Sequence, residues 1–198
     1  MAYESFTLDR LRDNFALTFV QTDDDYAAVK PIPPGEALQI VLARGRPLLS
    51  GKASEKARSE FIVAQVLLEA RDIVHNRIVV FSGIKFDVDK KAGLYGYCDF
   101  LISRDPLVHA IEAPVIAVAE AKKEDLNAGI PQCIAEMVAA QRFNAKRDKP
   151  LEKIYGVVTD GTRWQFLALT GTTVSLDLRE YGITELPQIL GILVHMVS

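Results

Sequence analysis

The stretch PVIAVAEAK, residues 114–122, is an almost unbroken run of apolar side chains that ends in an acid and a base. Its length and apolar character are typical of a strand that is covered on both faces, and therefore of a central strand in a sheet. Successive side chains of a strand point to opposite faces. This alternation predicts two rows: Ala117, Ala119 and Ala121 on one face, and Ile116, Val118, Glu120 and Lys122 on the other. Two charged residues would thus end a buried strand.

The sequence on both sides of this strand predicts a regular series of elements. A helix is expected over 53–72, which lacks Gly and Pro and is rich in good helix formers. The other predicted elements of this part are a hairpin of strands over 77–88 and 94–103, a helix over 129–147 with Pro131 in its first turn, and a hairpin over 154–159 and 163–169. The order helix, three strands, helix, strand predicts an α/β (α+β) protein with a mixed central sheet flanked by helices.

The two ends of the chain carry weaker patterns. We expect a helix over 8–15 behind a Thr7 cap, a strand over 17–21, a helix over 35–43, a strand over 172–178 and a helix over 185–197. The chain of 198 residues with 49% hydrophobic side chains is expected to form a single domain over 1–198. In this interpretation residues 1–52 are an N-terminal extension packed on a core of residues 53–169, and residues 170–198 add a C-terminal strand and helix.

Composition restricts the classes of function. The formal net charge of −3 argues against coating of nucleic acid by bulk charge, although basic residues gather in 44–58 and 142–153. Each basic stretch could bind phosphates or form a solvated surface. The absence of a basic leader and of an apolar run of bilayer length predicts a cytoplasmic protein with no membrane partner. Cys98 and Cys133 lie in apolar stretches without a Cys-x-x-Cys pair, so we expect both to be buried and reduced.

A polar side chain also interrupts the predicted strand over 94–103. Alternation places Tyr95, Tyr97, Asp99 and Leu101 on one face, so Asp99 stands in an apolar and aromatic row. If this strand neighbours the central strand, Asp99 and Glu120 can meet at one end of the sheet. Two converging carboxylates repel each other unless a positive charge lies between them, and a hard divalent cation is the natural occupant. The pattern indicates a metal site.

Two helical residues add polar groups beside apolar stripes. Glu60 shares its predicted stripe with Val63, Ala64 and Leu67, and Gln132 begins the later helix on the face of Ala135 and Ala139. Each position also fits an ordinary boundary residue, and a structural interpretation leaves Glu120 and Lys122 as an exposed pair at a strand end.

The short motif is informative only through its setting. Asp89-Lys90-Lys91 has the same acid-x-Lys letters as Glu120-Ala121-Lys122, yet it lies in a predicted hairpin turn without an apolar strand before it. The triplet at 120–122 differs because a buried strand delivers it next to Asp99.

In that setting the chain resembles the PD-(D/E)XK nucleases. Glu60 on a helix, GYCDFLI at 96–102, VAEAK at 118–122 and Gln132 occur in the order found in that superfamily, and the resemblance covers about residues 53–169. The family core is a restriction endonuclease-like αβββαβ unit, which agrees with the element order predicted from the residues alone. One position departs from the pattern, because Cys98 replaces the proline that often precedes the first acid.

The resemblance implies roles for the site residues. Asp99, Glu120 and the Ala121 carbonyl would bind Mg²⁺, with Mn²⁺ as a substitute. Lys122 would act on the attacking water, Glu60 would hold a metal-bound water or a second metal, and Gln132 would position Lys122 or a phosphate. The expected activity is metal-dependent hydrolysis of phosphodiester bonds in nucleic acid, with DNA the preferred substrate and endonuclease action favoured over exonuclease action.

One functional alternative stays open from the sequence. A nuclease-fold module could bind nucleic acid or a protein partner without cutting it. Sequence-specific cutting would in turn need a homodimer, a partner subunit or the N-terminal residues 1–52, because no separate recognition domain is evident.

Overall fold

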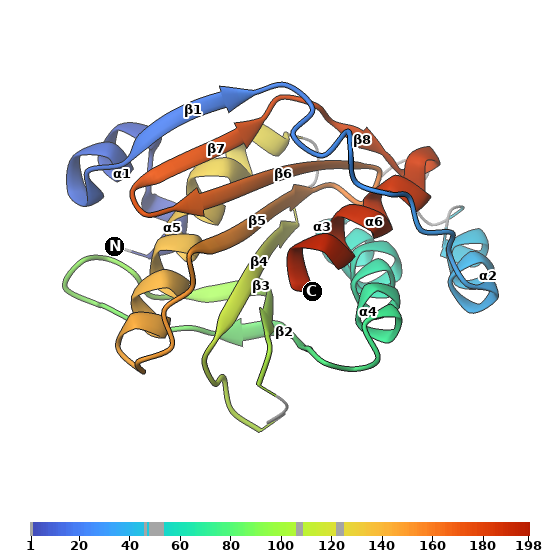
Figure 1. The fold of residues 1–198 in the computed structure, drawn as a ribbon, viewed down its shortest axis with the longest axis horizontal. Helices are drawn as coiled ribbons and strands as arrows, with labels where there is room; N and C mark the ends of the chain where they lie inside the picture. Colours follow the sequence, from blue (N-terminus) through green and yellow to red (C-terminus); the bar gives the residue numbers. More distant parts are fainter. Residues whose placement is uncertain (1, 46, 48–53, 106–108, 122–124) are drawn as a thin grey trace.

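The computed structural model describes residues 2–45, 47, 54–105, 109–121 and 125–198, and an extended sheet lies at its centre (Figure 1). Eight strands of the described residues form this mixed sheet in the order β1-β7-β6-β5-β4-β3-β2, and β8 pairs with β6 at one end. The strands are β1 (Thr18–Thr22), β2 (Val79–Lys85), β3 (Tyr97–Ser103), β4 (Val115–Ala121), β5 (Lys153–Thr159), β6 (Arg163–Thr170), β7 (Thr173–Asp177) and β8 (Tyr181–Gly182). The predicted mixed sheet flanked by helices is confirmed.

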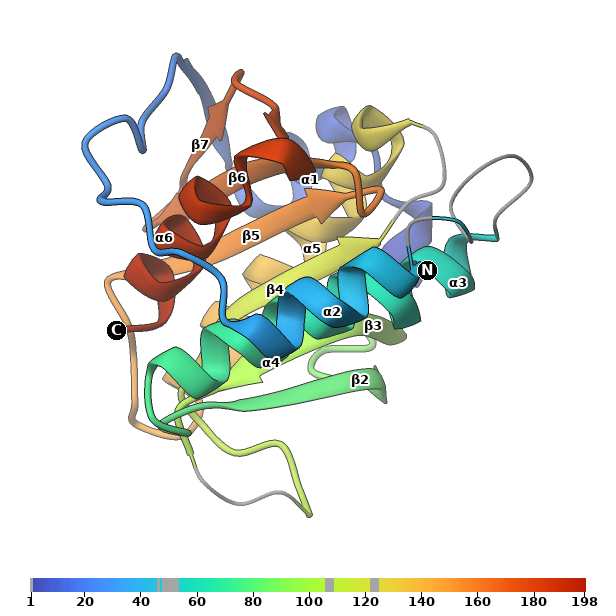
Figure 2. The ribbon, with the colours of Figure 1, turned by 90° about the vertical axis from the view of Figure 1, so that its right-hand side faces the viewer.

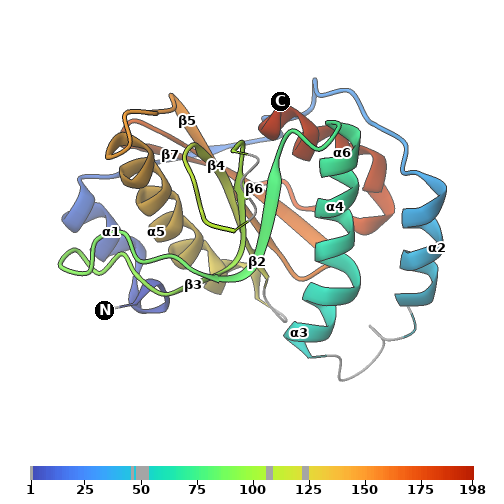
Figure 3. The same cartoon turned by 90° about the horizontal axis from the view of Figure 1, so that it is seen from below.

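Helices cover both faces of this sheet. They are η1 (Tyr3–Ser5), α1 (Leu8–Phe15), α2 (Glu36–Gly45), α3 (Glu55–Arg58), η3 (Ser59–Val63), α4 (Ala64–Ile73), α5 (Leu126–Ala145), η4 (Ile183–Glu185) and α6 (Leu186–Val197). Figures 2 and 3 show α4 and α6 on one face with α2 outside them, and α5 with α1 on the other face. Two buried apolar clusters correspond to these two layers, one on the α4 and α6 side and one on the α5 side. Among the described residues, no helix combines the length and the apolar character needed to cross a membrane.

β4 lies inside the sheet and is buried along its whole length, as its sequence predicts. It pairs antiparallel with β3 and parallel with β5. Ala117, Ala119 and Ala121 belong to the cluster on the α4 and α6 side, and Val118 belongs to the cluster on the α5 side. The predicted row is wrong at Ile116, which joins the cluster of the alanines. The pairing with β3 shifts register between Ile102 and Ser103, and such an irregularity changes the direction of nearby side chains.

The predicted single helix over 53–72 is interrupted. Its described part is α3, a π-helical turn η3 over Ser59–Val63, and α4. A π turn holds an extra residue, so the side chains before and after it do not keep the spacing of one continuous α-helix. Glu60 lies in this turn, and 56% of its side chain is exposed. Glu60 therefore does not keep the predicted helical spacing to the apolar residues that follow it.

The later helix begins earlier than predicted. α5 starts at Leu126 because the Asp125 side chain accepts a hydrogen bond from the Asn127 backbone N–H at 2.9 Å and caps the helix. Pro131 consequently lies inside the helix and not in its first turn, where its missing N–H would have cost nothing. The early start places Gln132 in the second turn of α5.

The ends of the chain complete the sheet. Thr7 caps α1, since its hydroxyl accepts a hydrogen bond from the Arg10 N–H at 3.3 Å, as predicted. β1 is an edge strand that pairs in parallel with β7, from Thr18 opposite Thr173 to Thr22 opposite Asp177. The predicted N-terminal strand therefore extends the same sheet that contains β4.

Candidate functional site

Asp99 reaches the end of the central strand through a side-chain hydrogen bond. β3 and β4 are neighbours, which is the condition for Asp99 and Glu120 to meet, and the pairing of Phe100 with Ala119 puts Asp99 opposite Glu120 one step further along. The Asp99 carboxylate Oδ2 accepts a hydrogen bond from the Ala121 backbone N–H at 2.9 Å. The Asp99 side chain thus provides the acceptor for the Ala121 N–H at the point where regular backbone pairing between the two strands ends.

The predicted alternation fails around Asp99. Cys98 packs in the cluster on the α5 side and Phe100 in the cluster on the α4 side, although two residues apart on a regular strand would share a face. Opposite Asp99, β2 carries Gly83 at φ +59°, between the paired residues Ser82 and Ile84. A left-handed residue in a strand disturbs the pleat, and glycine adopts this conformation readily. Because β3 begins at Tyr97 and is irregular at Asp99, the predicted single row from Tyr95 to Leu101 is wrong.

Glu120 lies on the α5 side of the sheet. Only 2% of its surface is exposed, and its Oε2 accepts a hydrogen bond from the Gln132 side-chain Nε2 at 2.8 Å. The same Nε2 donates to Glu136 Oε1 at 3.1 Å, one turn further along α5. The structure thus brings two of the predicted site residues, Glu120 and Gln132, into direct contact, and adds Glu136 to them.

Glu136 was missed from the sequence, although one pattern could have revealed it. It lies in an apolar part of α5 four residues after Gln132, where the helical repeat places both on one face. Burial raises the pKa of the Glu136 carboxyl well above its usual range, and the negative charge of Glu120 raises it further, against the lowering effect of the Gln132 hydrogen bond. The raised pKa favours the protonated form of Glu136, and a neutral carboxyl next to Glu120 avoids the repulsion of two buried charges.

The two cysteines are free and buried, in agreement with the sequence. Burial raises the pKa of the Cys98 thiol, and the nearby Glu136 and Glu120 carboxyls raise it further. A protonated thiol is a poor nucleophile and a poor metal ligand. Cys98 therefore belongs to the packing behind the site.

A pocket of about 330 Å³ opens beside the end of β4. Its lining includes Glu60 from η3, Asp99 from β3 and Ala121 from β4, together with residues of α3 and β2. Lys56 lies 3.7 Å from Glu60, but both side chains are largely exposed, so this ion pair holds Glu60 only weakly. Three of the predicted metal ligands thus share one accessible space.

The remaining predicted ligands are not gathered in the same way. Glu120 is buried beneath α5 and does not line the pocket, and Lys122 lies outside the described residues. Within the described part of the chain, no group of three or more His, Cys, Asp and Glu side chains could hold a metal ion. Glu60 and Asp99 bring two carboxylates to the lining of the pocket, and Mg²⁺ commonly takes only one or two carboxylates with water or phosphate completing its shell. The donor set fits this ion.

Asp89, the acid of the second triplet, has a different environment. It lies in the turn between β2 and β3, as predicted, and its carboxylate accepts hydrogen bonds from the Ala92 N–H at 3.1 Å and from Arg142 at 2.9 Å. The Ala92 hydrogen bond and the Arg142 charge lower the pKa of Asp89, against the raising effect of partial burial. This acid is engaged in holding a turn.

No protein-family model matches the chain, and no match was found among curated proteins.

Proposed function

We propose that the chain is a metal-dependent nuclease of the PD-(D/E)XK type, which hydrolyses phosphodiester bonds in nucleic acid, with DNA the favoured substrate and Mg²⁺ or Mn²⁺ as the cofactor. One observation carries this proposal. Asp99 is hydrogen-bonded at 2.9 Å to the backbone of Ala121, directly after Glu120, and both Asp99 and Ala121 line a pocket with Glu60. Oxygen donors from two adjacent strands and a helix thus converge at one end of the sheet.

The element order supports a restriction endonuclease-like core. The helical segment of α3, η3 and α4 precedes the antiparallel strands β2, β3 and β4, and α5 then leads to β5, which is parallel to β4. This is the αβββαβ order of the superfamily that the motifs resemble, and it places the candidate site at the end of a central strand.

Each side chain has a defined role in this proposal. Asp99, Glu60 and the Ala121 carbonyl would hold the ion, and Glu120 would join them by turning its carboxylate toward the pocket from its present contact with Gln132. A bound divalent ion would lower the pKa of water and stabilise the charge that develops on the phosphate. Lys122 is the proposed catalytic residue that acts on the attacking water.

Cleavage of labelled single-stranded and double-stranded DNA and of RNA, with Mg²⁺, Mn²⁺ or a chelator, tests the proposal. Asp99→Asn should lower the rate by about 100-fold or more, because it removes a charged metal ligand. Asp72→Asn is the matched control, since Asp72 is exposed at the end of α4, where its carboxylate pairs at 3.5 Å with the neighbouring Arg71. Metal-independent cleavage, or equal rates for the two variants, would reject the proposal.

A module that binds nucleic acid without cutting it is the second candidate. The burial of Glu120 beneath α5, outside the pocket, favours it. If the chain is such a module, neither metal should support cleavage. Its affinity for nucleic acid should fall steeply as salt is added.

A further inference from the structure

We propose that the hairpin of β2 and β3, with the pocket between its loop, α1 and α5, forms a binding track for a single-stranded nucleic acid that leads from Asp99 to Arg142. This inference rests on the proposed function, because it assigns a substrate form to the same site. The hairpin loop contains the second acid-x-Lys triplet, at 89–91, which the proposed catalytic site does not use.

The track begins with an exposed aromatic ring. Tyr97 is 66% exposed, the largest exposure among the large hydrophobic side chains of the described residues. It lies two residues before Asp99 on β3, a separation of roughly 7 Å along a strand, and it is paired with Lys85 on β2. An exposed ring beside a cation suits an unpaired base, which can stack on the ring while its phosphate meets the cation.

Basic side chains continue from this ring into the loop. Lys85 lies 3.4 Å from Asp87 and Lys90 lies 3.2 Å from the same carboxylate oxygen, so two ammonium groups share one acid. Lys91 forms no ion pair with any carboxylate of the described residues. The two acids of the loop, Asp87 and Asp89, match its two lysines in number, so the positive excess of this region comes from Lys85 on β2 and Arg142 on α5, which pair with those acids.

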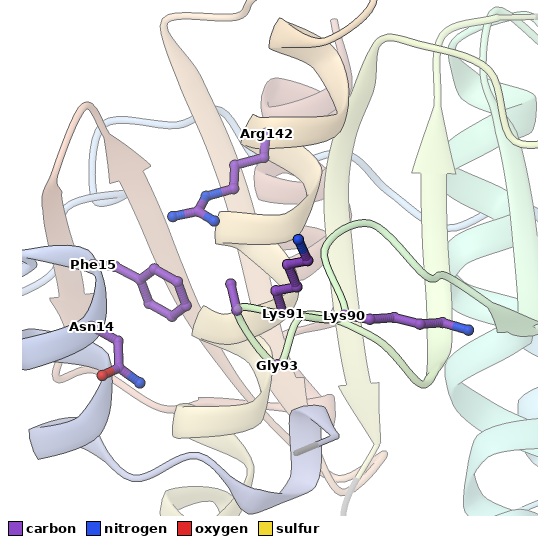
Figure 4. A pocket seen from close by; sticks show the side chains of 7 residues that line it. Asn14, Phe15, Lys90, Lys91, Gly93 and Arg142 are labelled. Carbon is purple, nitrogen blue, oxygen red and sulfur yellow. The ribbon is translucent and has the colours of Figure 1, made fainter.

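The track ends in a pocket of about 440 Å³ (Figure 4). Its lining contains Lys90, Lys91 and Arg142 but no acid, with Asn14 and Phe15 contributed by α1. The Arg142 guanidinium lies 4.9 Å from the centre of the Phe15 ring and 2.9 Å from Asp89, and Figure 4 shows Phe15 and Arg142 directed toward each other. These contacts hold Arg142 in one position before a ligand arrives, which reduces the entropy lost on binding a phosphate.

The combination favours a single strand over a duplex. Stacking on Tyr97 requires a base that is not already stacked in a helix, and a concave pocket of this size admits a phosphate with its nucleoside but not the width of a duplex. The net charge of −3 also leaves little bulk attraction for a duplex, so binding depends on local charges such as these.

Fluorescence anisotropy in the presence of a chelator separates binding from cleavage. The probes are oligothymidylate and oligouridylate of about 12 nucleotides, a length typical of single-strand sites, and a duplex of equal length. Tyr97→Ala should weaken binding of the single strand about tenfold, and Tyr97→Phe should restore it, because the ring provides the stacking.

Lys91→Ala should reduce the slope of log affinity against log salt by about 0.7, the value for one lost contact with single-strand phosphate. Lys30→Ala is the matched control, since Lys30 is exposed and its backbone packs against α6, across the sheet from the pocket.

Each outcome bears on the track. Binding of either single strand with the expected losses supports it, and the preferred oligonucleotide identifies the sugar. Equal affinity of Tyr97→Ala and the wild type, tighter binding of the duplex, or displacement by an aspartate-rich peptide would overturn it. Metal-dependent cleavage of duplex without single-strand binding would support the proposed nuclease function and reject the single-strand binding track. Single-strand binding without cleavage under any metal would keep the track and remove the proposed function.

Discussion

The acids of the two acid-x-Lys triplets, Glu120 and Asp89, differ in nearly every physical property that the structure describes. Glu120 ends a buried central strand and is hydrogen-bonded by Gln132, beside a second buried carboxyl. Asp89 holds a surface turn and pairs with Arg142, and its pKa is lowered. The comparison shows that three letters of sequence carry no chemistry by themselves. The strand or turn that presents them decides whether a carboxylate is confined next to another acid or neutralised by a cation.

The largest expected difference between the triplets concerns their lysines. Lys122→Ala should lower kcat by about 100-fold or more, the effect of removing a charged group that acts in the transition state. Lys91→Ala should raise KM with little change in kcat, because Lys91 is proposed to contact substrate phosphate away from the reacting bond. Steady-state kinetics of both variants on one oligonucleotide measures the difference. A large loss of kcat in Lys91→Ala would break the distinction between the two triplets.

Sequence patterns were sufficient for the central strand of the sheet. The run at 114–122 predicted a central strand because an uninterrupted apolar segment of this length can be stable only when both faces are covered, and β4 is buried throughout. The pairing of β2 with β3 was predicted from the hairpin pattern of residues 77–88 and 94–103, which depends on local turn and strand preferences, whereas the pairing of β3 with β4 was only a condition of the predicted site.

The arrangement of the site required information that local patterns do not contain. Asp99 lies opposite Gly83, which has a left-handed conformation on a different strand. Glu60 is exposed and lies in a π turn. Glu136 and the burial of Glu120 depend on how α5 packs over β4, a contact between elements that are each individually regular. Lys122 lies outside the described residues, so its predicted place beside Asp99 and Glu120 stays a prediction.

A smaller difference is expected in the stability that each acid's partner provides. Gln132→Leu removes the donor to both Glu120 and Glu136 and should cost about 1–3 kcal/mol, the usual penalty for a buried polar group that loses its hydrogen bond. Arg142→Ala removes the partner of Asp89, but Asp89 and Arg142 are both accessible to water, so the loss should be clearly smaller. Urea unfolding of the two variants gives both free energies. A larger loss for Arg142→Ala would mean that the turn, and not the buried pair, limits stability here.

The smallest expected effect is a difference in how stability changes with pH. The raised pKa of Glu136 means that the folded chain keeps a proton that the unfolded chain has released, so its contribution is complete below the ordinary glutamate pKa and declines as pH rises toward the raised value. Asp89 has a lowered pKa and behaves in the opposite way, because its contribution is present at neutral pH and is lost as pH falls through the lowered value. As pH rises above the ordinary glutamate pKa, stability should therefore fall with a slope of at most about 1.4 kcal/mol per pH unit from Glu136, with Asp89 contributing no slope there. Glu136→Gln should flatten this slope, whereas Asp89→Asn and the exposed control Glu36→Gln should preserve it. An unchanged slope in Glu136→Gln would show that Glu136 is not the group that holds the proton.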